Sequence, residues 1–182
     1  MNFIECKGYM IPGLDFENNY SIWLLRWKEN PINSQYLTEV WLFHPDGKRV
    51  CYIDPKDEIN FFKKYHSFDE VIGADIDVLE ESNKIKINVN DDLTIEVKTG
   101  FSFLYSIINL ILSEKHKVVG KTETGKTNEN IPNRLLKIVN ASAELNSKNF
   151  GKMKKTNKEV LIGDGKASKK PIISYCTLRL ET

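Results

Sequence analysis

Eight consecutive residues in the second half of the chain have the types and spacing of a phosphate-binding loop. Gly120 to Thr127 (GKTETGKT) matches the pattern GxxxxGK[ST], in which backbone N–H groups wrap phosphates and Lys126 reaches the outer ones. This chemistry needs a strand before the loop and a helix directly after it. Only Val118 and Val119 precede the loop, and Pro132 lies in the polar segment that follows, where it disfavours a continuing helix. We therefore interpret the match as a coincidental turn and expect no cofactor.

Lysine could supply a different chemistry, because a lysine in an apolar barrel can lose its proton and form a Schiff base with a carbonyl substrate. The lysines that lie beside apolar segments are Lys115, Lys117, Lys121 and the pair Lys169-Lys170. Lysine is seldom buried, so most lysines of this chain are expected to be solvated. None of the candidates stands out, and the sequence leaves the identity of any catalytic residue unknown.

Two carboxylates, Asp75 and Asp77, would project from the same face of one strand, opposite Ile76 and Val78. Such a pair could perform acid–base chemistry if that face lined a cavity. The simpler interpretation, which we favour, is a solvated outer face with cross-strand charge pairs. The neighbouring segments supply matching charges at Lys84, Lys86, Glu96 and Lys98.

Histidine and cysteine give no pattern typical of a metal centre, and we predict no metal site. The histidines lack the i, i+4 spacing of a helical metal pair; they are His44, His66 and His116. The cysteines are odd in number, widely spaced and without a Cys-x-x-Cys motif; they are Cys6, Cys51 and Cys176. This pattern favours free thiols, and with them a cytoplasmic location, over a disulfide framework.

An aromatic set on three consecutive expected strands suggests a site for a small, largely apolar molecule. Its members are Tyr20, Trp23, Trp27, Tyr36, Trp41, Phe43 and Tyr52. Small-molecule sites are commonly lined by such side chains with a few polar groups among them, although core packing uses the same residue types. The predicted lining comprises Trp23, Trp27, Trp41 and Phe43, with Asn140 and Ser142 as polar members.

The segment Val71 to Thr99 would organise the fold as three antiparallel strands joined by short polar loops. Apolar and polar residues alternate strictly in three runs, which end near Leu79, Val89 and Val97. Alternation with period two indicates one buried face and one solvated face. This meander needs the remaining chain to cover its apolar face.

The other elements follow from local patterns. We expect strands over 20–28, 35–44 and 49–54, with a tight turn at Pro45-Asp46-Gly47, and a short helix within 57–66. Residues 1–19, 120–133 and 146–159 are expected to be irregular, apart from a short edge strand at the start. The last strands are expected over 135–145, 160–162 and 171–180. Phe101 to Leu112 is expected to be a helix capped by Thr99, and to be buried, a lid or an interface, although a strand is possible.

The fold class expected from these elements is mainly β: an antiparallel β-barrel or barrel-like sandwich of about eight to ten strands with one or two helices. Residues 1–182 would form one domain, since 41% of the residues are apolar. The 26 basic and 25 acidic residues nearly cancel, which gives no indication of a nucleic-acid partner. No secretory signal is evident at the N-terminus, and the apolar run 101–112 is too short to span a membrane.

The succession of antiparallel strands with an aromatic N-terminal part resembles lipocalin-type barrels, and also the barrel of acetoacetate decarboxylase-like proteins. The resemblance is architectural and covers most of the chain, without a specific motif. A lipocalin-like Gly-x-Trp is missing near the N-terminus, and no position here can be assigned as a Schiff-base lysine. No functional residue is therefore carried over from either family.

We predict a cytoplasmic protein that binds a small, largely apolar molecule inside the barrel. One alternative is an enzyme of the same architecture that acts on a carbonyl or carboxylate substrate through a desolvated lysine or aspartate. Another is an interaction module that forms a homodimer through Phe101–Leu112.

Overall fold

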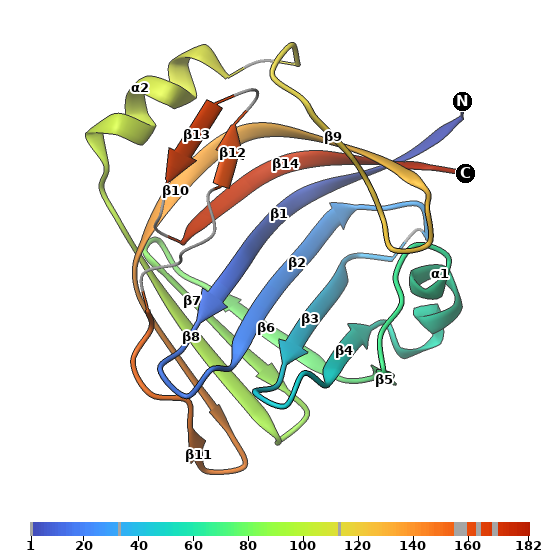
Figure 1. Cartoon of the computed structure of the whole chain (residues 1–182), viewed down its shortest axis with the longest axis vertical. Coiled ribbons are helices and arrows are strands. Elements are labelled where there is room, and N and C mark those ends of the chain that lie inside the picture. The colour runs from blue at the N-terminus through green and yellow to red at the C-terminus, as the bar shows by residue number, and fades with distance from the viewer. Residues whose placement is uncertain (1, 33, 113, 155–159, 163–164, 169–170) are drawn as a thin grey trace.

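A computed structural model shows a strongly curled β-sheet with few helices (Figure 1). It describes residues 2–182 except 33, 113, 155–159, 163–164 and 169–170. Ten of the described strands follow one hydrogen-bonded path in the order β5-β4-β3-β2-β1-β14-β10-β8-β7-β6, while β9 and β11 pair with β10. This arrangement confirms the predicted mainly β, barrel-like fold.

The elements have the following bounds. The first half of the chain contains β1 (Phe3–Asp15), β2 (Ser21–Glu29), β3 (Leu37–Phe43), β4 (Arg49–Asp54), the 3-10 helix η1 (Lys56–Glu58), α1 (Ile59–Lys63), β5 (Glu70–Gly73), β6 (Ile76–Glu80) and β7 (Lys84–Val89). The second half contains β8 (Leu93–Gly100), α2 (Phe103–Ile111), β9 (Val118–Lys121), β10 (Thr127–Leu145), β11 (Lys148–Asn149), β12 (Val160–Ile162), β13 (Gly165–Ser168) and β14 (Ile172–Glu181). Strands β12 and β13 pair only with each other.

The expected meander is present as β6, β7 and β8, but its first strand begins later than predicted. The chain changes partner at Ala74 and Asp75: the preceding β5 pairs in parallel with β4, and the following β6 pairs antiparallel with β7. The Ala74 N–H donates to the carbonyl of Ile53, and the Asn90 N–H donates to the carbonyl of Asp75. These bonds hold the two edges of the curled sheet close to each other.

The N-terminal segment is not the irregular lead-in that the sequence suggested. It forms the long strand β1, which pairs with β14 on one side and β2 on the other. Gly8, Pro12 and Gly13 misled the prediction, because their turn preferences are accommodated at irregularities inside a strand. The register with β2 shifts after Lys7 and again between Ile11 and Leu14.

Residues 120–133 were also predicted as a loop, and here too the structure differs. Strands β9 and β10 form a hairpin whose turn covers Thr122 to Lys126. Gly125 has φ of +84° and permits the tight turn. The hairpin was missed because its strands carry few apolar residues, so period-two alternation of hydrophobicity is absent.

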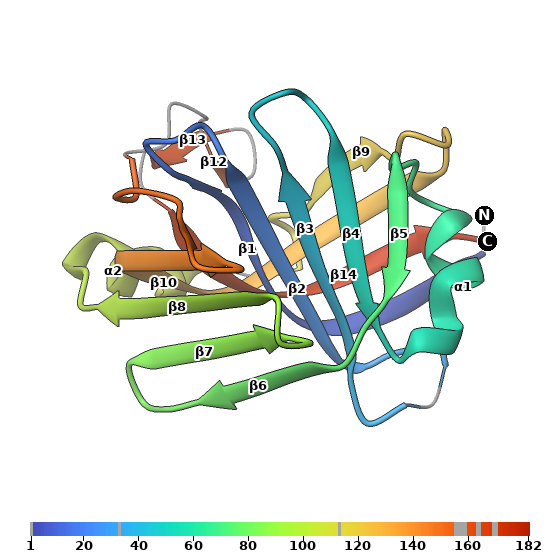
Figure 2. The same cartoon turned by 90° about the horizontal axis from the view of Figure 1, so that it is seen from below.

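The curled sheet encloses an interior core of apolar side chains. Figure 2 shows the two walls of the half-barrel: β6, β7 and β8 form one wall, and β1 to β5 form the other. Side chains from both walls join in one buried cluster, represented by Ile11, Leu24, Val40, Ile76, Ile87 and Ile95. Apolar side chains of both walls therefore pack together inside the half-barrel.

Side chains on the opposite face of β1 to β4 form a second core. In β2, Ile22 and Leu24 point to the interior core, while Trp23, Leu25 and Trp27 point the other way. The second core is completed by α1, and it includes Trp27, Leu37, Trp41, Cys51, Ile53 and Phe62. The aromatic strands are therefore covered on both faces, as their composition indicated.

The two predicted helical segments are helical, with two corrections. Helix α2 is capped by Ser102, whose side chain accepts a hydrogen bond from the Tyr105 N–H. The predicted cap, Thr99, is instead a residue of strand β8. Helix α2 is also not buried, since Leu110 is 86% exposed and Phe103 is 71% exposed. Among the described residues, no helix is long and apolar enough to cross a membrane.

The basic segment after β10 is only partly the solvated loop that was predicted. Phe150 is fully buried and stacks on Tyr20 with ring centroids 4.3 Å apart. Met153 forms an isolated β-bridge with Phe16. Residues 155–159 of this segment lie outside the described residues.

The close approach of β1 to β2 gives a testable requirement for glycine. A Cβ at Gly8 would overlap the carbonyl oxygen of Arg26, which is part of the β2 backbone. We expect Gly8→Ala to lower the free energy of unfolding by about 1–3 kcal/mol, because the backbone must shift. Urea denaturation measures this loss.

The matched control is Gly120→Ala in β9, where the nearest atom would be the Asn128 side-chain oxygen at 3.4 Å. That contact is ordinary, so we expect a change smaller than about 1 kcal/mol. Equal denaturation midpoints for the two variants would contradict the assigned pairing of β1 and β2.

Candidate functional site

A cavity of about 490 Å³ lies on the second-core face of the sheet, beneath the β9–β10 hairpin. We call it the aromatic cavity. Its floor comes from β1, β2, β3 and β14, its roof from β9 and β10, and one side from the segment after α1. The lining residues are Met10, Ser21, Trp23, Leu25, Trp41, Phe43, His66, Lys121, Thr122, Glu123, Asn128, Asn130, Leu178 and Leu180.

Three aromatic side chains form one wall of the aromatic cavity. Trp23 and Trp41 are directly cross-strand neighbours, and their rings stack with centroids 5.6 Å apart and an interplanar angle of 11°. Phe43 lies beside Trp23 with a centroid distance of 6.3 Å. The near-parallel ring planes show that Trp23 and Trp41 stack on each other, and together with Phe43 they give the cavity an aromatic wall.

A buried carboxyl group holds one of these rings. Glu39 is only 6% exposed, and the Trp41 indole Nε1 donates to its Oε2 over 3.0 Å. The Trp27 indole also hydrogen-bonds to this carboxyl. Burial raises the pKa of Glu39, although the nearby His66 and the two indole bonds oppose the rise. Glu39 is not part of the lining, and we regard it as a positioning residue for Trp41.

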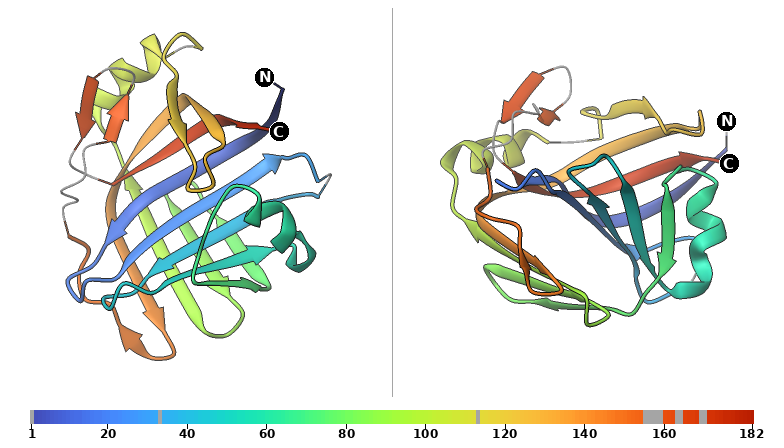
Figure 3. Two further views of the ribbon diagram at one scale, coloured as in Figure 1. Left: turned by 45° about the vertical axis from the view of Figure 1, so that its right-hand side comes forward. Right: turned by 60° about the horizontal axis from the view of Figure 1, so that its bottom comes forward.

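The roof is tethered to the segment that contains α1. His66 Nδ1 lies 2.9 Å from Glu123 Oε2, and the Thr124 hydroxyl donates to the carbonyl of Lys64 over 3.0 Å. The His66 ring also packs edge-on against Trp41 at 4.8 Å. Figure 3 shows the hairpin reaching across the sheet to the neighbourhood of α1. The two contacts at its tip therefore close the cavity on that side.

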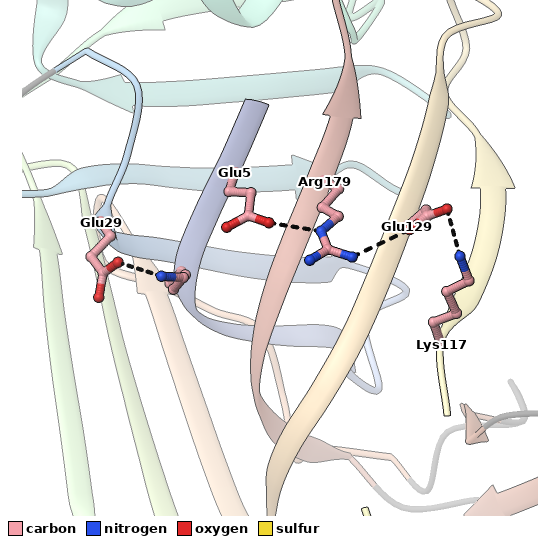
Figure 4. A network of polar contacts seen from close by, with 6 residues as sticks. Glu5, Glu29, Lys117, Glu129 and Arg179 are labelled. Atoms are coloured by element: carbon pink, nitrogen blue, oxygen red, sulfur yellow. Dashed lines mark hydrogen bonds and ion pairs between the residues drawn. The ribbon is translucent and has the colours of Figure 1, made fainter. Parts of the chain in front are cut away.

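A chain of ion pairs fixes the strands that carry this roof (Figure 4). Arg179 in β14 bonds Glu5 in β1 at 2.8 Å and approaches Glu129 in β10 at 3.8 Å. Glu129 in turn pairs with Lys117, which directly precedes β9, at 2.9 Å. Since Leu178 and Asn130 face the cavity, Arg179 and Glu129 alternate to the opposite face of the sheet.

A few polar atoms at the cavity have no hydrogen-bond partner among the residues that the structure describes. They include the buried side-chain oxygens of Ser21 and Asn130, two lining residues. The Asn130 amide nitrogen contacts the Met10 sulfur at 3.1 Å. Buried polar atoms usually have a partner, so these two are available to bond a ligand or a water molecule.

The predicted site residues are brought together only in part. Trp23, Trp41 and Phe43 lie in the lining of the aromatic cavity. Trp27 is 1% exposed within the second core, outside the lining. Asn140 and Ser142 are exposed on β10, opposite Lys98 and Glu96 of β8, so the structure does not bring them to the cavity. The sequence prediction placed Asn140 and Ser142 on the same strand face as Ile138, because it assumed regular alternation along the strand. The register shift between Ile138 and Asn140 interrupts that alternation.

Sequence reasoning missed Glu39, His66 and the roof residues. The signal for Glu39 was a lone acidic residue inside the apolar run of β3, which indicates a buried carboxyl. His66 was considered only as a metal ligand. The roof residues carried no recognisable signal once the hairpin was taken for a loop.

The eight residues that match the phosphate-binding pattern form the end of the β9–β10 hairpin. The N–H groups of Thr122 and Gly125 bond within the turn, and the Thr127 N–H donates to the Glu181 carboxylate. Thr127 begins β10 rather than a helix. Three backbone donors of the motif are thus occupied, and a strand stands where the phosphate-binding loop requires a helix.

The lysines and acidic residues that the sequence suggested for catalysis lie away from the aromatic cavity, except Lys121, which belongs to its lining. Lys115, Lys117 and Lys121 are exposed, while Lys169-Lys170 lie outside the described residues. Asp75 is solvated, as predicted, but it pairs with Lys56 of η1 at 2.6 Å rather than with a neighbouring strand. Glu96 pairs with Lys84 at 2.7 Å, which is a cross-strand charge pair of the predicted kind. In the described part of the chain, His, Cys, Asp and Glu form no group of three that could hold a metal ion.

The three cysteines are free and buried. Burial raises the pKa of Cys6 to about 12, and the negative charge of the Glu39 carboxyl contributes to the rise. Burial likewise raises the pKa of Cys176 to about 12 and that of Cys51 well above its ordinary value. These thiols therefore stay protonated at neutral pH and act as apolar core residues.

Comparisons with known proteins bear on the fold of the chain. No protein-family model matches it, and no curated protein matches it either. Among solved structures, the chain is similar to acetoacetate decarboxylase from Legionella pneumophila, with a TM-score of 0.49 and 7% sequence identity. The alignment covers 100% of this chain and 85% of that one. We draw no functional argument from a likeness at this level.

The buried Glu39 carboxyl predicts a pH dependence of stability. Burial raises the pKa of Glu39 in the folded protein, so this carboxyl loses its proton at a lower pH in the unfolded chain. The free energy of unfolding therefore falls as the pH rises above the pKa of an unfolded glutamate, about 4.3. The Glu39→Gln variant has no such charge. We expect its free energy of unfolding, relative to that of the original protein, to increase as the pH rises above about 4.3.

Urea denaturation at several pH values measures this difference. Glu144→Gln is the matched control, since Glu144 is exposed on β10, and its curve should run parallel to that of the original protein. A parallel curve for Glu39→Gln as well would contradict the burial of an ionisable carboxyl behind Trp41.

Proposed function

We propose that this protein binds a small, flat and largely apolar molecule in the aromatic cavity. The observation that carries the proposal is the stacked pair Trp23 and Trp41, which forms the wall of a cavity rather than part of the packed interior. The proposed site therefore lies outside the half-barrel, beneath the β9–β10 hairpin.

The size and composition of the cavity support this proposal. Small-molecule sites commonly measure about 300–1,000 Å³ and combine apolar walls with a few polar groups. The volume of about 490 Å³ falls in that range, and the floor is aromatic and aliphatic. A molecule of one or two fused rings could lie flat against Trp23 and Trp41.

Polar groups gather mainly on the roof, which suggests how a ligand would be oriented. Asn128, Asn130 and Lys121 come from the hairpin, while Ser21 adds a hydroxyl from the floor. The unpartnered oxygens of Ser21 and Asn130 favour a ligand that carries a hydroxyl or similar polar group at its edge.

The alternatives named from the sequence remain predictions. A lysine that forms a Schiff base needs a desolvated setting, which the exposed Lys115, Lys117 and Lys121 lack. A homodimer through Phe101–Leu112 is compatible with the exposure of that segment, and its oligomeric state is addressed by the experiment on α2 below.

Titration with 2-naphthol, a flat apolar molecule with one hydroxyl group, tests the proposed function. We expect calorimetry to show saturable binding at one site. Trp23→Ala should weaken binding about tenfold, because one face of the stacking surface is lost. Trp23→Phe should restore most of the affinity, since an aromatic ring is retained.

Leu110→Ser is the matched control, because Leu110 is an exposed apolar residue of α2 far from the lining. It should leave the affinity for 2-naphthol unchanged. The proposal is wrong if 2-naphthol does not bind, or if Leu110→Ser reduces binding while Trp23→Ala does not.

A further inference from the structure

Helix α2 and the residue two positions before it present a contiguous apolar surface to solvent. Six large side chains project outward, with exposed fractions from 45% for Ile107 to 86% for Leu110. We call them the α2 face; they are Phe101, Phe103, Leu104, Ile107, Leu110 and Ile111. No charged residue occurs between Phe101 and Leu112. Large exposed apolar patches usually mark an interaction surface.

The α2 face is held outward by specific contacts on the other side of the helix. Tyr105 is buried against Leu135 and Ile172, with Ile108 and Leu112 packed beside them. Asn109 makes two bonds to the Leu135 backbone, donating to its carbonyl at 3.0 Å and accepting from its N–H at 2.8 Å. The orientation of α2 is therefore fixed by β10, and the exposure of its outer side is a property of the fold.

A basic groove adjoins this surface. A groove of about 250 Å³ runs between α2 and β10, and its lining includes Arg134, Lys137, Ser106 and Asn109 but no acidic side chain. Among the described residues, neither Arg134 nor Lys137 has an ion-pair partner within 4.0 Å. Lys137 lies opposite Ile172, which packs beneath α2, so it places one cation beside the six apolar side chains. Arg134 lies opposite Tyr175, on the face of β10 that packs against the interior core.

We propose that the α2 face and the adjoining groove dock onto a lipid surface that contains anionic phospholipids. The apolar side chains would enter the boundary between headgroups and acyl chains, as those of interfacial helices do. Lys137 would bind the phosphate groups, which attract cations near the surface. This inference is independent of the aromatic cavity.

A second copy of the chain fits the same surface less well. Stable protein–protein interfaces take about 20–30 residues from each partner, whereas the α2 face supplies six side chains. The groove lining holds Lys137 and no carboxylate, so a second copy would have to supply an acidic side chain from elsewhere on its surface. Anionic headgroups complement both parts of the surface.

Vesicle co-sedimentation of the full chain tests the proposal. We compare vesicles of phosphatidylcholine alone with vesicles that also contain about one-third phosphatidylglycerol. Binding should be strong only to the second type. Leu110→Ser should reduce it about tenfold, because burial of one leucine is lost, and Lys137→Gln should reduce it about fivefold.

Leu79→Ser is the matched control, since Leu79 is an exposed leucine of β6, 58% accessible, outside the α2 face. It should bind like the original protein. Absence of binding, or equal binding to both vesicle types, would overturn the proposal. So would light scattering that shows a dimer at micromolar concentration which Leu110→Ser converts to a monomer.

Discussion

Backbone hydrogen bonding along the nineteen-residue strand β10 is the constraint on which the rest of this structure depends. Its first half pairs with β14 and β9, and its second half pairs with β14 and then with β8. One strand therefore belongs to the roof of the aromatic cavity at one end and to the wall of the half-barrel at the other. The register shifts at Pro132–Arg134 and Ile138–Asn140 allow β10 to bend between its roof end and its wall end.

The bend of β10 explains why the sheet has two separate cores. On one side, β6 to β8 fold toward β1 to β4 and seal the interior core with aliphatic residues such as Ile87 and Ile95. On the other side, the β9–β10 hairpin curls over the opposite face without filling the space above Trp23. The result is an apolar core inside the half-barrel and a cavity on its outer face.

Much of the architecture could be predicted from alternation of apolar and polar residues in β7 and β8, and from the aromatic and apolar composition of β2, β3 and β4. The strands β2, β3, β4, β7 and β8 carry clear patterns, and the mainly antiparallel, barrel-like sheet follows from them. Strand β1 was hidden by Gly8 and Pro12, whose effects depend on neighbours that only tertiary structure supplies. The β9–β10 hairpin was hidden because ion pairs and turn bonds, rather than burial of apolar residues, stabilise it.

The candidate site was predictable only as a set of residue types. Trp23 and Trp27 share one face of β2 and have the same local pattern, yet Trp23 lines a cavity while Trp27 is enclosed. The difference arises from what covers each ring: the hairpin above Trp23, and the packed second core around Trp27. Glu39, placed behind Trp41, shows that a single buried polar residue in an apolar strand can be more informative than a run of aromatic ones.

The most direct test of the central claim is a fluorine NMR spectrum of the protein labelled with 5-fluorotryptophan, recorded during titration with 2-naphthol. The chain has three tryptophans, so the three signals can be assigned with single Trp→Phe variants. The account predicts that the signals of Trp23 and Trp41 shift together with saturation, while that of the enclosed Trp27 changes much less. Unchanged signals for Trp23 and Trp41 in the presence of bound 2-naphthol would contradict a ligand site in the aromatic cavity.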